Sequence, residues 1–453
     1  MRESSTGNTG RDMSPANLST KRRWIADLAR DKRGTALTLL HHLIDLEWMH
    51  EAYELTRKDG ATGIDGVTAQ AYEVSLEANL TDLLGRIKSG RYRAPPVRRT
   101  YIPKADGSQR PLGIPTFEDK VAQRAIVMAL EAVYEQDFLP CSYGFRPKRS
   151  AHDALRALRG AISRQGQHFV VEVDIRKYFD SISHHELRAI LDQRVTDGRH
   201  PTGDRQMVES GSAGRRAPAP DEGRNPARRR DLTDALEHLP APRADEWFEN
   251  EVKPRMAGPC TLVRFADDFV MTFKNHHDAE RVLHVLGKRL ERYGLRLHPD
   301  KTRFIDFRPG SQGGTPKDGK GPPFDFLGFT HTWGRSLKGR RVVRQQTAKS
   351  RLVRALHAVS DWCRTNRHQP LLWQQARLSA KLVGHFAYYG ITGNLWQLGR
   401  FRQQVTRTWR KWLRRRTRAN TLSWERFNVF LERHPFPQAR IIHRYAAASK
   451  ALT

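Results

Sequence analysis

Apolar residues recur along this chain with the two periods that helices and strands require. Residues 24–55 show leucines at helical intervals, and after a loop the pattern resumes and continues to residue 87. The loop, residues 58–68, contains three glycines and two aspartates, which favour turns. A strand is expected at 98–103, and residues 120–134 repeat the helical pattern with one buried face. The first folded part should therefore be mainly helical.

Further along, strand patterns carry acidic residues at their ends. Residues 169–174 (FVVEVD) are a β-branched run that ends in an aspartate. Two more apolar runs, 262–265 and 269–273, are separated by the sequence Ala-Asp-Asp. This arrangement predicts a hairpin with acids at its tip, beside a strand that ends in a further acid.

The remaining pattern is helical and increasingly basic. Residues 279–294 fit a helix that is closed by a glycine cap, and a loop rich in Gly, Pro and Lys follows at 310–323. From about residue 347 onward the chain is helical, basic and rich in tryptophan. The polar stretch that ends near Lys21 is expected to be disordered.

The charge of the chain points to a polyanionic partner. Among 453 residues, Lys and Arg number 79 and Asp and Glu 49, which gives a formal net charge of +30 and a pI of about 10.6. Such an excess weakens a compact fold through self-repulsion unless something neutralises it, and nucleic acid is the first candidate. From charge alone, a basic protein of ribosomal type is an equal alternative.

Cysteine usage and hydropathy indicate the compartment. Cys141, Cys260 and Cys363 lie far apart in sequence and show neither a paired framework nor metal-ligand spacing, which fits a reducing cytosol. The N-terminus lacks the apolar core of a signal peptide, and no run approaches the roughly 18 apolar residues of a membrane span. We therefore expect a cytoplasmic protein without membrane association.

The acids at the strand ends suit a magnesium-dependent polymerase. Nucleotidyl transfer uses two divalent cations, one that activates the attacking 3′ oxygen and one that stabilises the leaving pyrophosphate. Magnesium prefers carboxylate oxygens and keeps several waters, so two or three aspartates are enough. Asp267 and Asp268 can both reach one site at a tight hairpin, and Asp174 can supply a third carboxylate. Taken singly, an Asp-Asp pair in a turn is more often ordinary solvated turn chemistry.

The order of several motifs distinguishes these alternatives. Residues 173–187 (VDIRKYFDSISHHEL) and 263–270 (VRFADDFV) resemble the two metal-binding motifs of group II intron reverse transcriptases, which usually have Tyr at the position of Phe265. The resemblance runs from about residue 55 to 443. Further blocks resemble the finger and later palm motifs of that family, the last being its primer-contacting segment: 63–68 (GIDGVT), 101–116 (YIPKADGSQRPLGIPT), 142–154 (SYGFRPKRSAHDA), 294–302 (GLRLHPDKT) and 324–329 (FDFLGF).

The resemblance implies a right-hand polymerase fold of the α+β class. It places an N-terminal extension, disordered and then helical, at 1–54, followed by fingers and an antiparallel palm at 55–335. An all-α thumb or maturase domain follows at 345–453. Nothing after His443 resembles the HNH-type endonuclease that some members of the family append, so we expect no second-strand cleavage.

The resemblance also implies roles for individual residues. Phe179 matches the aromatic residue that stacks under the incoming sugar and rejects a 2′-hydroxyl, while Lys104 and Arg110 match finger residues that contact the triphosphate. Lys301 matches a cation near the leaving pyrophosphate, where it is a plausible general acid. A core aromatic and solvated cations are the alternatives, and Asp180 is expected to make a structural hydrogen bond. Two Mg²⁺ ions would be held by Asp174, Ile175, Asp267 and Asp268.

The C-terminal region combines a core stripe with a cationic exterior. A solvated amphipathic helix is the usual interpretation of this pattern, but the density of cations favours phosphate contacts, whose strength falls steeply with salt. In the family this region grips the intron RNA, so the expected partners are group II intron RNA, a DNA primer or target, and dNTPs. The stripe is Val405, Trp409, Trp412 and Leu413, and the cations are Arg407, Arg410, Lys411, Arg414 and Arg415.

One family motif is missing between the two metal-binding motifs. The family carries a Gly-Thr-Pro-Gln-Gly-Gly block that packs against the templating base pair, whereas residues 200–243 lack aromatic residues and are rich in Arg, Pro, Gly and Ala. Read one base forward with permitted third bases, residues 224–240 become GTPQGGVISPMLSNIYL, and 200–209 become a plausible helix. Two compensating indels, near Arg199 and Ala244, would place the segment out of frame, either in the gene or through a sequencing error.

The sequence therefore predicts an RNA-directed DNA polymerase of a group II intron that also binds the intron RNA to assist splicing and mobility. Its activity is in doubt because of the missing block. The alternative is a catalytically dead RNA-binding maturase remnant, for which the basic C-terminal helices suffice. A basic structural protein of another class is disfavoured because charge alone does not generate ordered metal motifs. The cognate intron and the oligomeric state do not follow from the sequence.

Overall fold

The computed structural model divides the chain into two compact units, each discontinuous in sequence. The first unit comprises Met1–Arg149, Ile175–Pro254 and Val285–His298, and the second comprises Ser150–Asp174, Arg255–His284 and Pro299–Thr453. The structure describes residues 17–38, 40–103, 109–176, 189–196, 245–292, 295–310, 322–336, 338–416 and 422–445.

The first unit begins with helices whose ends are set by local caps. The Asn17 side chain accepts a hydrogen bond from the Thr20 amide at 2.9 Å, and Asp45 accepts one from the Trp48 amide at 3.1 Å. Gly34, with φ of 78°, follows the first helix. The helical region that was expected at 24–55 is therefore three helices: α1 (Leu18–Asp31), α2 (Leu40–Leu43) and α3 (Leu46–Leu55).

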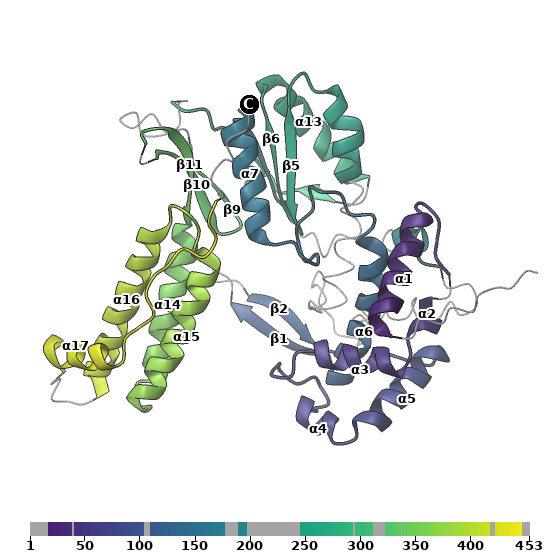
Figure 1. Ribbon diagram of the computed structural model, residues 1–453, viewed down its shortest axis with the longest axis horizontal. Helices are drawn as coiled ribbons and strands as arrows, with labels where there is room; N and C mark the ends of the chain where they lie inside the picture. The colour runs from purple at the N-terminus through teal and green to yellow at the C-terminus, as the bar shows by residue number, and fades with distance from the viewer. Residues whose placement is uncertain are drawn as a thin grey trace, which may run out of the picture. The chain divides into compact units, whose positions relative to one another are not determined.

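The core of this unit is the long helix α6 (Phe117–Tyr134), which packs against α1 and α3 (Figure 1). Val121, Ala125 and Val133 are fully buried, as the pattern predicted. Val127 and Leu130 are buried as well, so α6 is covered on more than the single face that was expected. The other elements of the unit are α4 (Ala69–Glu73), α5 (Leu76–Lys88), β1 (Arg98–Pro103), β2 (Gln109–Ile114), β4 (Ile175–Arg176), β7 (Arg296–Leu297), the π-helix η1 (Trp247–Val252) and the 3₁₀ turn η2 (Lys253–Arg255).

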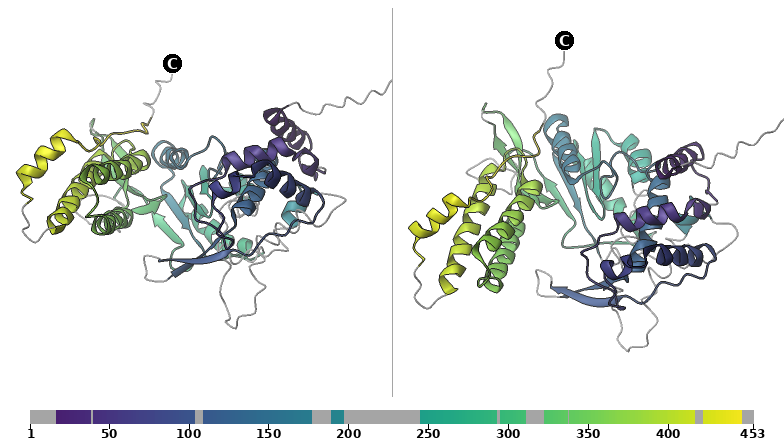
Figure 2. Two further views of the ribbon diagram at one scale, coloured as in Figure 1. Left: turned by 90° about the horizontal axis from the view of Figure 1, so that it is seen from below. Right: turned by 60° about the horizontal axis from the view of Figure 1, so that its bottom comes forward.

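The second unit contains a four-stranded antiparallel sheet with the strand order β5-β6-β3-β8. Helix α7 (Ala151–Gln165) lies along β5 and β6, and α13 (His276–Glu291) begins shortly after β6 (Figures 1 and 2). Val170, Val171 and Val263 are fully buried, as expected for strands that support a core. The strands are β3 (Phe169–Val173), β5 (Cys260–Phe265), β6 (Asp268–Phe273) and β8 (Arg303–Asp306).

A smaller antiparallel sheet follows, with the strand order β11-β10-β9. Phe326 pairs with Phe329, so Leu327 and Gly328 form a two-residue turn between β9 and β10. The Trp333 indole donates to the carbonyl of Phe307 at 2.5 Å. The strands are β9 (Phe324–Phe326), β10 (Phe329–Arg335) and β11 (Arg341–Thr347).

The chain continues as a helical bundle in which α14, α15 and α16 lie side by side (Figures 1 and 2). Trp409 is fully buried, donates its indole N–H to Gln374 Oε1 at 2.8 Å, and packs against Phe427. This core confirms the helical and tryptophan-rich pattern. The helices are α14 (Lys349–Thr365), α15 (Leu371–Tyr389), α16 (Leu395–Leu413), the 3₁₀ turn η3 (Arg414–Arg416) and α17 (Trp424–Arg433).

Helices and antiparallel sheets confirm the α+β class. Nearly all of the loop expected at 310–323 and the whole segment 200–243 lie outside the described residues. Within the described parts of the chain, no helix is long and apolar enough to cross a bilayer.

Candidate active site at the end of the four-stranded sheet

The hairpin β5-β6 carries two of the predicted acids. Phe265 pairs with Asp268, which leaves Ala266 and Asp267 as the two residues of a tight turn. Ala266 has φ of 59°, a left-handed conformation that glycine adopts far more easily than alanine. The structure thus confirms the predicted hairpin with acids at its tip, and it adds a strained residue beside them, as is often found at functional sites.

The third predicted acid lies at the same end of the sheet, on the neighbouring strand β3. Val173 pairs with Phe269 at the end of the antiparallel β3-β6 ladder. The next residues, Asp174 on one side and Asp268 on the other, therefore lie opposite each other. The Thr302 hydroxyl donates to the carbonyl of Asp174 at 3.3 Å and anchors the end of β3. Strand pairing, rather than sequence proximity, therefore brings Asp174 beside Asp268.

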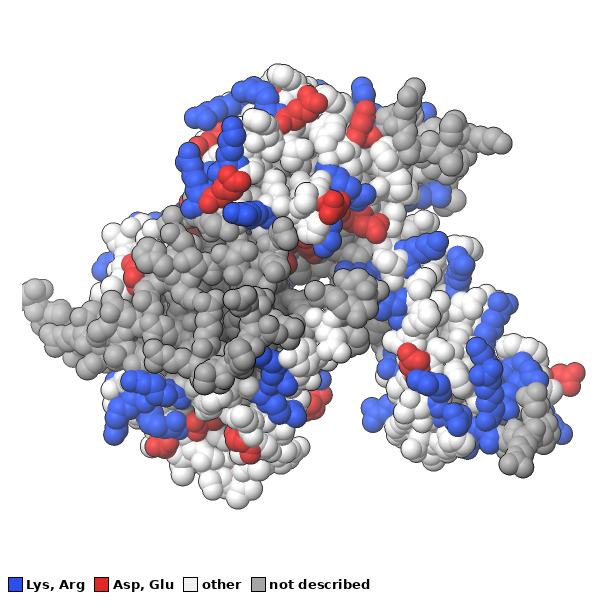
Figure 3. Space-filling view, turned by 180° about the vertical axis from the view of Figure 1, so that it is seen from behind, with Lys and Arg blue, Asp and Glu red and all other residues white. Residues whose placement is uncertain are grey.

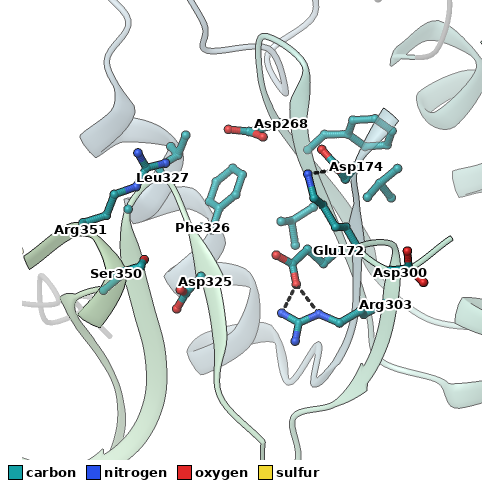
Figure 4. Close-up of a pocket in the computed structure, with 16 residues that line it drawn as sticks. Glu172, Asp174, Asp268, Asp300, Arg303, Asp325, Phe326, Leu327, Ser350 and Arg351 are labelled. Atoms are coloured by element: carbon teal, nitrogen blue, oxygen red, sulfur yellow. Dashed lines mark hydrogen bonds and ion pairs between the residues drawn. The ribbon is translucent and has the colours of Figure 1, made fainter. Parts of the chain in front are cut away.

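A cavity of about 340 Å³ lies at this end of the sheet. Asp174 and Asp268 line it together with Glu172 and, from β9, Asp325 (Figure 4). Asp267 is not among the lining residues. Among the described residues, no three His, Cys, Asp or Glu side chains are close enough together to hold a metal ion. The fold therefore brings two of the three predicted carboxylates into one cavity and leaves the third in the adjoining turn.

Two basic side chains pair with carboxylates of the cavity. Lys301 Nζ lies 3.1 Å from Asp174 Oδ2, although the lysine side chain remains 65% exposed. Arg303 contacts Glu172 Oε2 through Nη2 at 2.5 Å and through Nε at 3.1 Å, shown as dashed lines in Figure 4. Lys301, predicted to act near pyrophosphate, is thus in direct contact with a predicted metal ligand.

Among the residues that the structure describes, Asp268 makes no such ion pair, and its pKa is raised. The side chain opens into the cavity, yet the surrounding protein limits its hydration, and this desolvation is the largest cause of a pKa raised to about 6. The negative charges of Asp267 and Asp174 raise the pKa further, and Arg351 partly opposes them. Desolvation likewise raises the pKa of Glu172, although Arg303 acts against it. The cavity therefore holds negative charge that its own cations do not fully balance.

The wall opposite the acids is a second strained turn. Leu327 and Gly328 both line the cavity, and they have φ of 50° and 78°. Positive φ at both central residues is the type I′ arrangement, which normally selects Asn or Gly at the first position. Leu327 therefore has a left-handed backbone conformation that leucine rarely adopts. Arg351 and Ser350 lie on the same side of the cavity as this turn in Figure 4.

Comparisons with known proteins connect this part of the chain with reverse transcriptases. The family described as reverse transcriptase (RNA-dependent DNA polymerase) matches residues 102–207 and 242–331, which include all three acids. The chain is also 34% identical over 160 residues to the group II intron-encoded protein LtrA of Lactococcus lactis, covering 35% of this chain and 26% of LtrA. This chain contains a reverse transcriptase domain, and the relatives that it matches include group II intron-encoded proteins and intron maturases.

Two further relatives match smaller or similar parts of the chain. Protein YkfC of Escherichia coli is 38% identical over 170 residues, which cover 36% of this chain and 45% of YkfC. Nuclear intron maturase 2 of Arabidopsis thaliana is 31% identical over 86 residues, which cover 18% of this chain and 11% of that protein. The chain thus spans less than half of the length of each of these curated relatives.

The structure describes only some of the other residues with predicted roles at this site. Lys104 and Phe179 lie outside the described residues, as does Asp180. Arg110 lies in β2, where it pairs with Ile102, and its side chain is not described. Ile175 lies in β4 and pairs with Leu297. These four roles stay predictions.

Several residues of the site were not predicted from the sequence. Glu172 precedes Asp174 by two positions in a strand pattern, so its location on the same face was available from the two-residue period. Asp325, Leu327 and Arg351 reach the cavity only through the packing of β9 and α14. No local pattern marks those three as neighbours of Asp268.

Three of the cations predicted on the C-terminal helices contact tryptophan rings. Arg410 donates to the carbonyl of Leu422 at 3.0 Å and lies 4.1 Å over the Trp424 ring, so it holds the bundle together. Arg415 and Lys411 lie 4.9 and 5.8 Å from the ring centre of Trp412. Figure 3 shows Lys and Arg side chains gathered over these helices with few acids among them.

Proposed function

We propose that this chain is an RNA-directed DNA polymerase of a group II intron, with fingers, palm and thumb arranged as in a right-hand polymerase. The main observation in support is that Asp174 and Asp268 line one cavity at the end of an antiparallel sheet. Both residues lie inside the region that matches reverse transcriptases. Its substrates would be dNTPs and a DNA primer, and its template the intron RNA.

The chemistry of the cavity fits divalent cations. Carboxylate oxygens are the ligands that Mg²⁺ prefers, and the raised pKa of Asp268 marks unbalanced negative charge that a cation would relieve. Asp174 and Asp268 would hold the metal, with Asp267 and the backbone of Ile175 as further candidates. When bound, two such ions supply the charge that activates the 3′-hydroxyl and stabilises the departing pyrophosphate.

The protein's own side chains orient this chemistry. Arg303 keeps Glu172 occupied, which leaves Asp174 and Asp268 as the acids available to a cation. Lys301 lies against Asp174 and is exposed enough to turn toward a bound phosphate, where it would donate a proton or balance charge. Lys104, Arg110 and Phe179 remain proposed contacts to the nucleotide.

The same chain is proposed to bind its intron RNA and to assist splicing in the cytoplasm. Between residues 349 and 445 the only acids are Asp361, Glu425 and Glu432, among many arginines. This imbalance, concentrated on helices with exposed faces, supports contact with a phosphate backbone.

A second candidate function follows from the break in the family match. The match to reverse transcriptases stops at residue 207 and resumes at 242, which nearly coincides with the segment proposed to be out of frame. If the altered segment belongs to the natural protein, polymerisation should be severely impaired, and the chain would act as an RNA-binding maturase remnant.

Magnesium-dependent primer extension on an RNA template tests the first function. Asp268→Asn removes the charge but keeps the shape, and it should lower synthesis by at least a hundredfold while RNA binding stays unchanged. Asp325→Asn is the matched control, because Asp325 lines the same cavity but lies on β9. Undiminished synthesis by the Asp268→Asn protein would show that the catalytic assignment is wrong.

A further inference from the structure

The strained turn that lines the cavity is held by a tyrosine from the helical bundle. The Tyr388 hydroxyl, at the end of α15, donates to the carbonyl of Leu327 at 2.9 Å. Phe329, the residue after the turn, packs against the Tyr388 ring with centroids 5.7 Å apart. A left-handed leucine persists only where its surroundings over-determine it, and this hydrogen bond falls on the strained residue itself.

Tyr388 is itself held by a pair of stacked imidazoles. His152 Nε2, near the start of α7, lies 2.7 Å from the carbonyl oxygen of Tyr388. The rings of His152 and His443 stack with centroids 3.5 Å apart and an angle of 16°. His443 Nε2 lies 2.9 Å from the carbonyl oxygen of Ala387, one residue before Tyr388. The two histidine side chains thus contact consecutive backbone carbonyls, those of Ala387 and Tyr388, at the end of α15.

His443 belongs to a short segment, residues 440–445, which we call the strap. The strap is fixed by backbone bonds, since the amides of Ile442 and His443 donate to the carbonyl of Gly390 at 2.7 and 2.8 Å. A Cβ atom at position 390 would lie 2.3 Å from the carbonyl oxygen of Phe386 and 3.0 Å from that of Arg440, so this position requires glycine.

The strap also contacts helix α7 and strand β11 of the smaller sheet. The ring of Tyr445 lies 4.3 Å from the guanidinium of Arg159 on α7, and its hydroxyl donates to Gln345 on β11. Gln345 in turn donates to the carbonyl of Leu155 on α7 at 3.0 Å. The strap therefore joins α7, β11 and the end of α15 in one set of contacts.

We propose that Tyr388 is a positioning residue for the nucleic-acid end bound in the cavity, and that the strap keeps it in place through His443. Tyr388 would act by holding the Leu327–Gly328 turn opposite Asp268, because a backbone shift there changes the wall of the cavity. Small displacements of a positioning element have large effects on reacting ends. The inference rests on the proposed polymerase function for its substrate, a recessed primer end on RNA.

The test compares Tyr388→Phe, which removes only the hydroxyl, with Tyr72→Phe, whose buried hydroxyl has no hydrogen-bond partner among the described residues. Affinity for a primer–template with a recessed 3′ end is measured by fluorescence anisotropy, beside affinity for single-stranded RNA of the same length. Tyr388→Phe should weaken primer–template binding by about three- to tenfold, the size expected for one hydrogen bond, and leave single-strand binding unchanged. Equal affinities for the wild-type and Tyr388→Phe proteins would overturn the inference.

A rescue distinguishes positioning from direct contact. Leu327→Asn favours the left-handed conformation without help, so the double variant Leu327→Asn/Tyr388→Phe should regain most of the lost affinity. His443→Ala should weaken binding like Tyr388→Phe, and the two losses should not add, because they act on one chain of contacts. Failure of the rescue would show that the hydroxyl acts on the ligand rather than on the turn.

Primer extension by the same proteins separates this inference from the proposed function. Tyr388→Phe should raise KM for the primer–template, while KM for the nucleotide and kcat stay close to wild type. A wild-type protein that binds primer–template but makes no DNA would contradict the polymerase function only. The anisotropy comparison still decides the role of Tyr388 in that case.

Discussion

The residue that carries the proposed chemistry is also one that opposes folding. Asp268 opens into the cavity near two other aspartates, and partial desolvation together with their negative charges raises its pKa from the ordinary 3.8 to about 6. A carboxylate so placed is unfavourable until a cation or substrate compensates it. Lys301 pairs with Asp174 and Arg303 pairs with Glu172, whereas Asp268 makes no ion pair among the described residues and is stabilised in its charged form by the charge of Arg351.

A pH-dependent gain in stability should therefore follow from Asp268→Asn in metal-free buffer. Because the folded pKa of about 6 exceeds the unfolded 3.8, the penalty is fully present above pH 6 and disappears as the pH falls toward 3.8. At pH 7.5 the thermal midpoint should rise by on the order of 2 °C, and near pH 4 the two proteins should coincide.

Asp306→Asn provides the control of opposite sign. The hydrogen bond from Arg308 lowers the pKa of Asp306, so its contribution to stability is present at neutral pH and is lost on acidification. This variant should melt below wild type at pH 7.5, and the difference should shrink at acid pH. A midpoint for Asp268→Asn below that of wild type at pH 7.5 would contradict the assigned environment.

At the level of elements, α16 serves two purposes with one sequence pattern. Val405, Trp409 and Leu413 are buried against the other helices, as the spacing predicted. Trp412 is only partly buried and donates to Ser360 Oγ at 3.1 Å. The cations between these positions are left on the outside, except that Arg410 is used to hold Leu422 and Trp424.

RNA binding by this element should depend strongly on salt. Replacing Arg407, Lys411 and Arg415 by Gln should reduce affinity for intron RNA and lower the slope of log affinity against log salt by about 2 to 3, since each phosphate contact contributes roughly 0.7 to 0.9. The measurement is a filter-binding titration at several KCl concentrations.

The matched control removes the same charge elsewhere. Arg30, Arg57 and Lys253 are each paired with an acid, so their triple replacement by Gln should leave the slope nearly unchanged. Equal slopes for both triple variants would mean that net charge, rather than the surface of α16, determines binding.

At the scale of the whole molecule, the out-of-frame hypothesis makes the sharpest prediction. A version in which the region 200–244 is restored to the shifted translation gains the Gly-Thr-Pro-Gln-Gly-Gly block and several apolar residues. We expect primer extension on RNA only in the restored protein, together with a higher thermal midpoint, because the restored segment can pack.

The comparison needs both proteins under the same conditions. Asp268→Asn in the restored version serves as the control that any synthesis comes from the proposed site. Equal synthesis by both versions would mean that the missing block is dispensable. The nucleotide sequence is an independent check, because codons that cannot give the shifted translation would contradict the hypothesis directly.

Much of the local structure could be predicted, because the spacing of apolar residues both identifies a helix or strand in the sequence and determines which of its faces is buried. The strand at 98–103, the strand ending before Asp174 and the hairpin around Asp267 appear where the apolar runs placed them. The long helical region before residue 55 was divided by caps and Gly34. The burial of α6 on several sides depends on partner helices that no window of sequence contains.

For this protein, the sequence alone determined the family, the candidate carboxylates and the basic character, since ordered motifs and charge are properties of the chain itself. Only the tertiary structure decided which groups share the cavity. Strand pairing joined Asp174 to Asp268 but left Asp267 in the turn. Packing brought Leu327 and Arg351 to the cavity and placed the Tyr388 hydroxyl on the Leu327 carbonyl. Such contacts join residues far apart in the chain, and their free energy comes from burial and hydrogen bonding that exist only after folding.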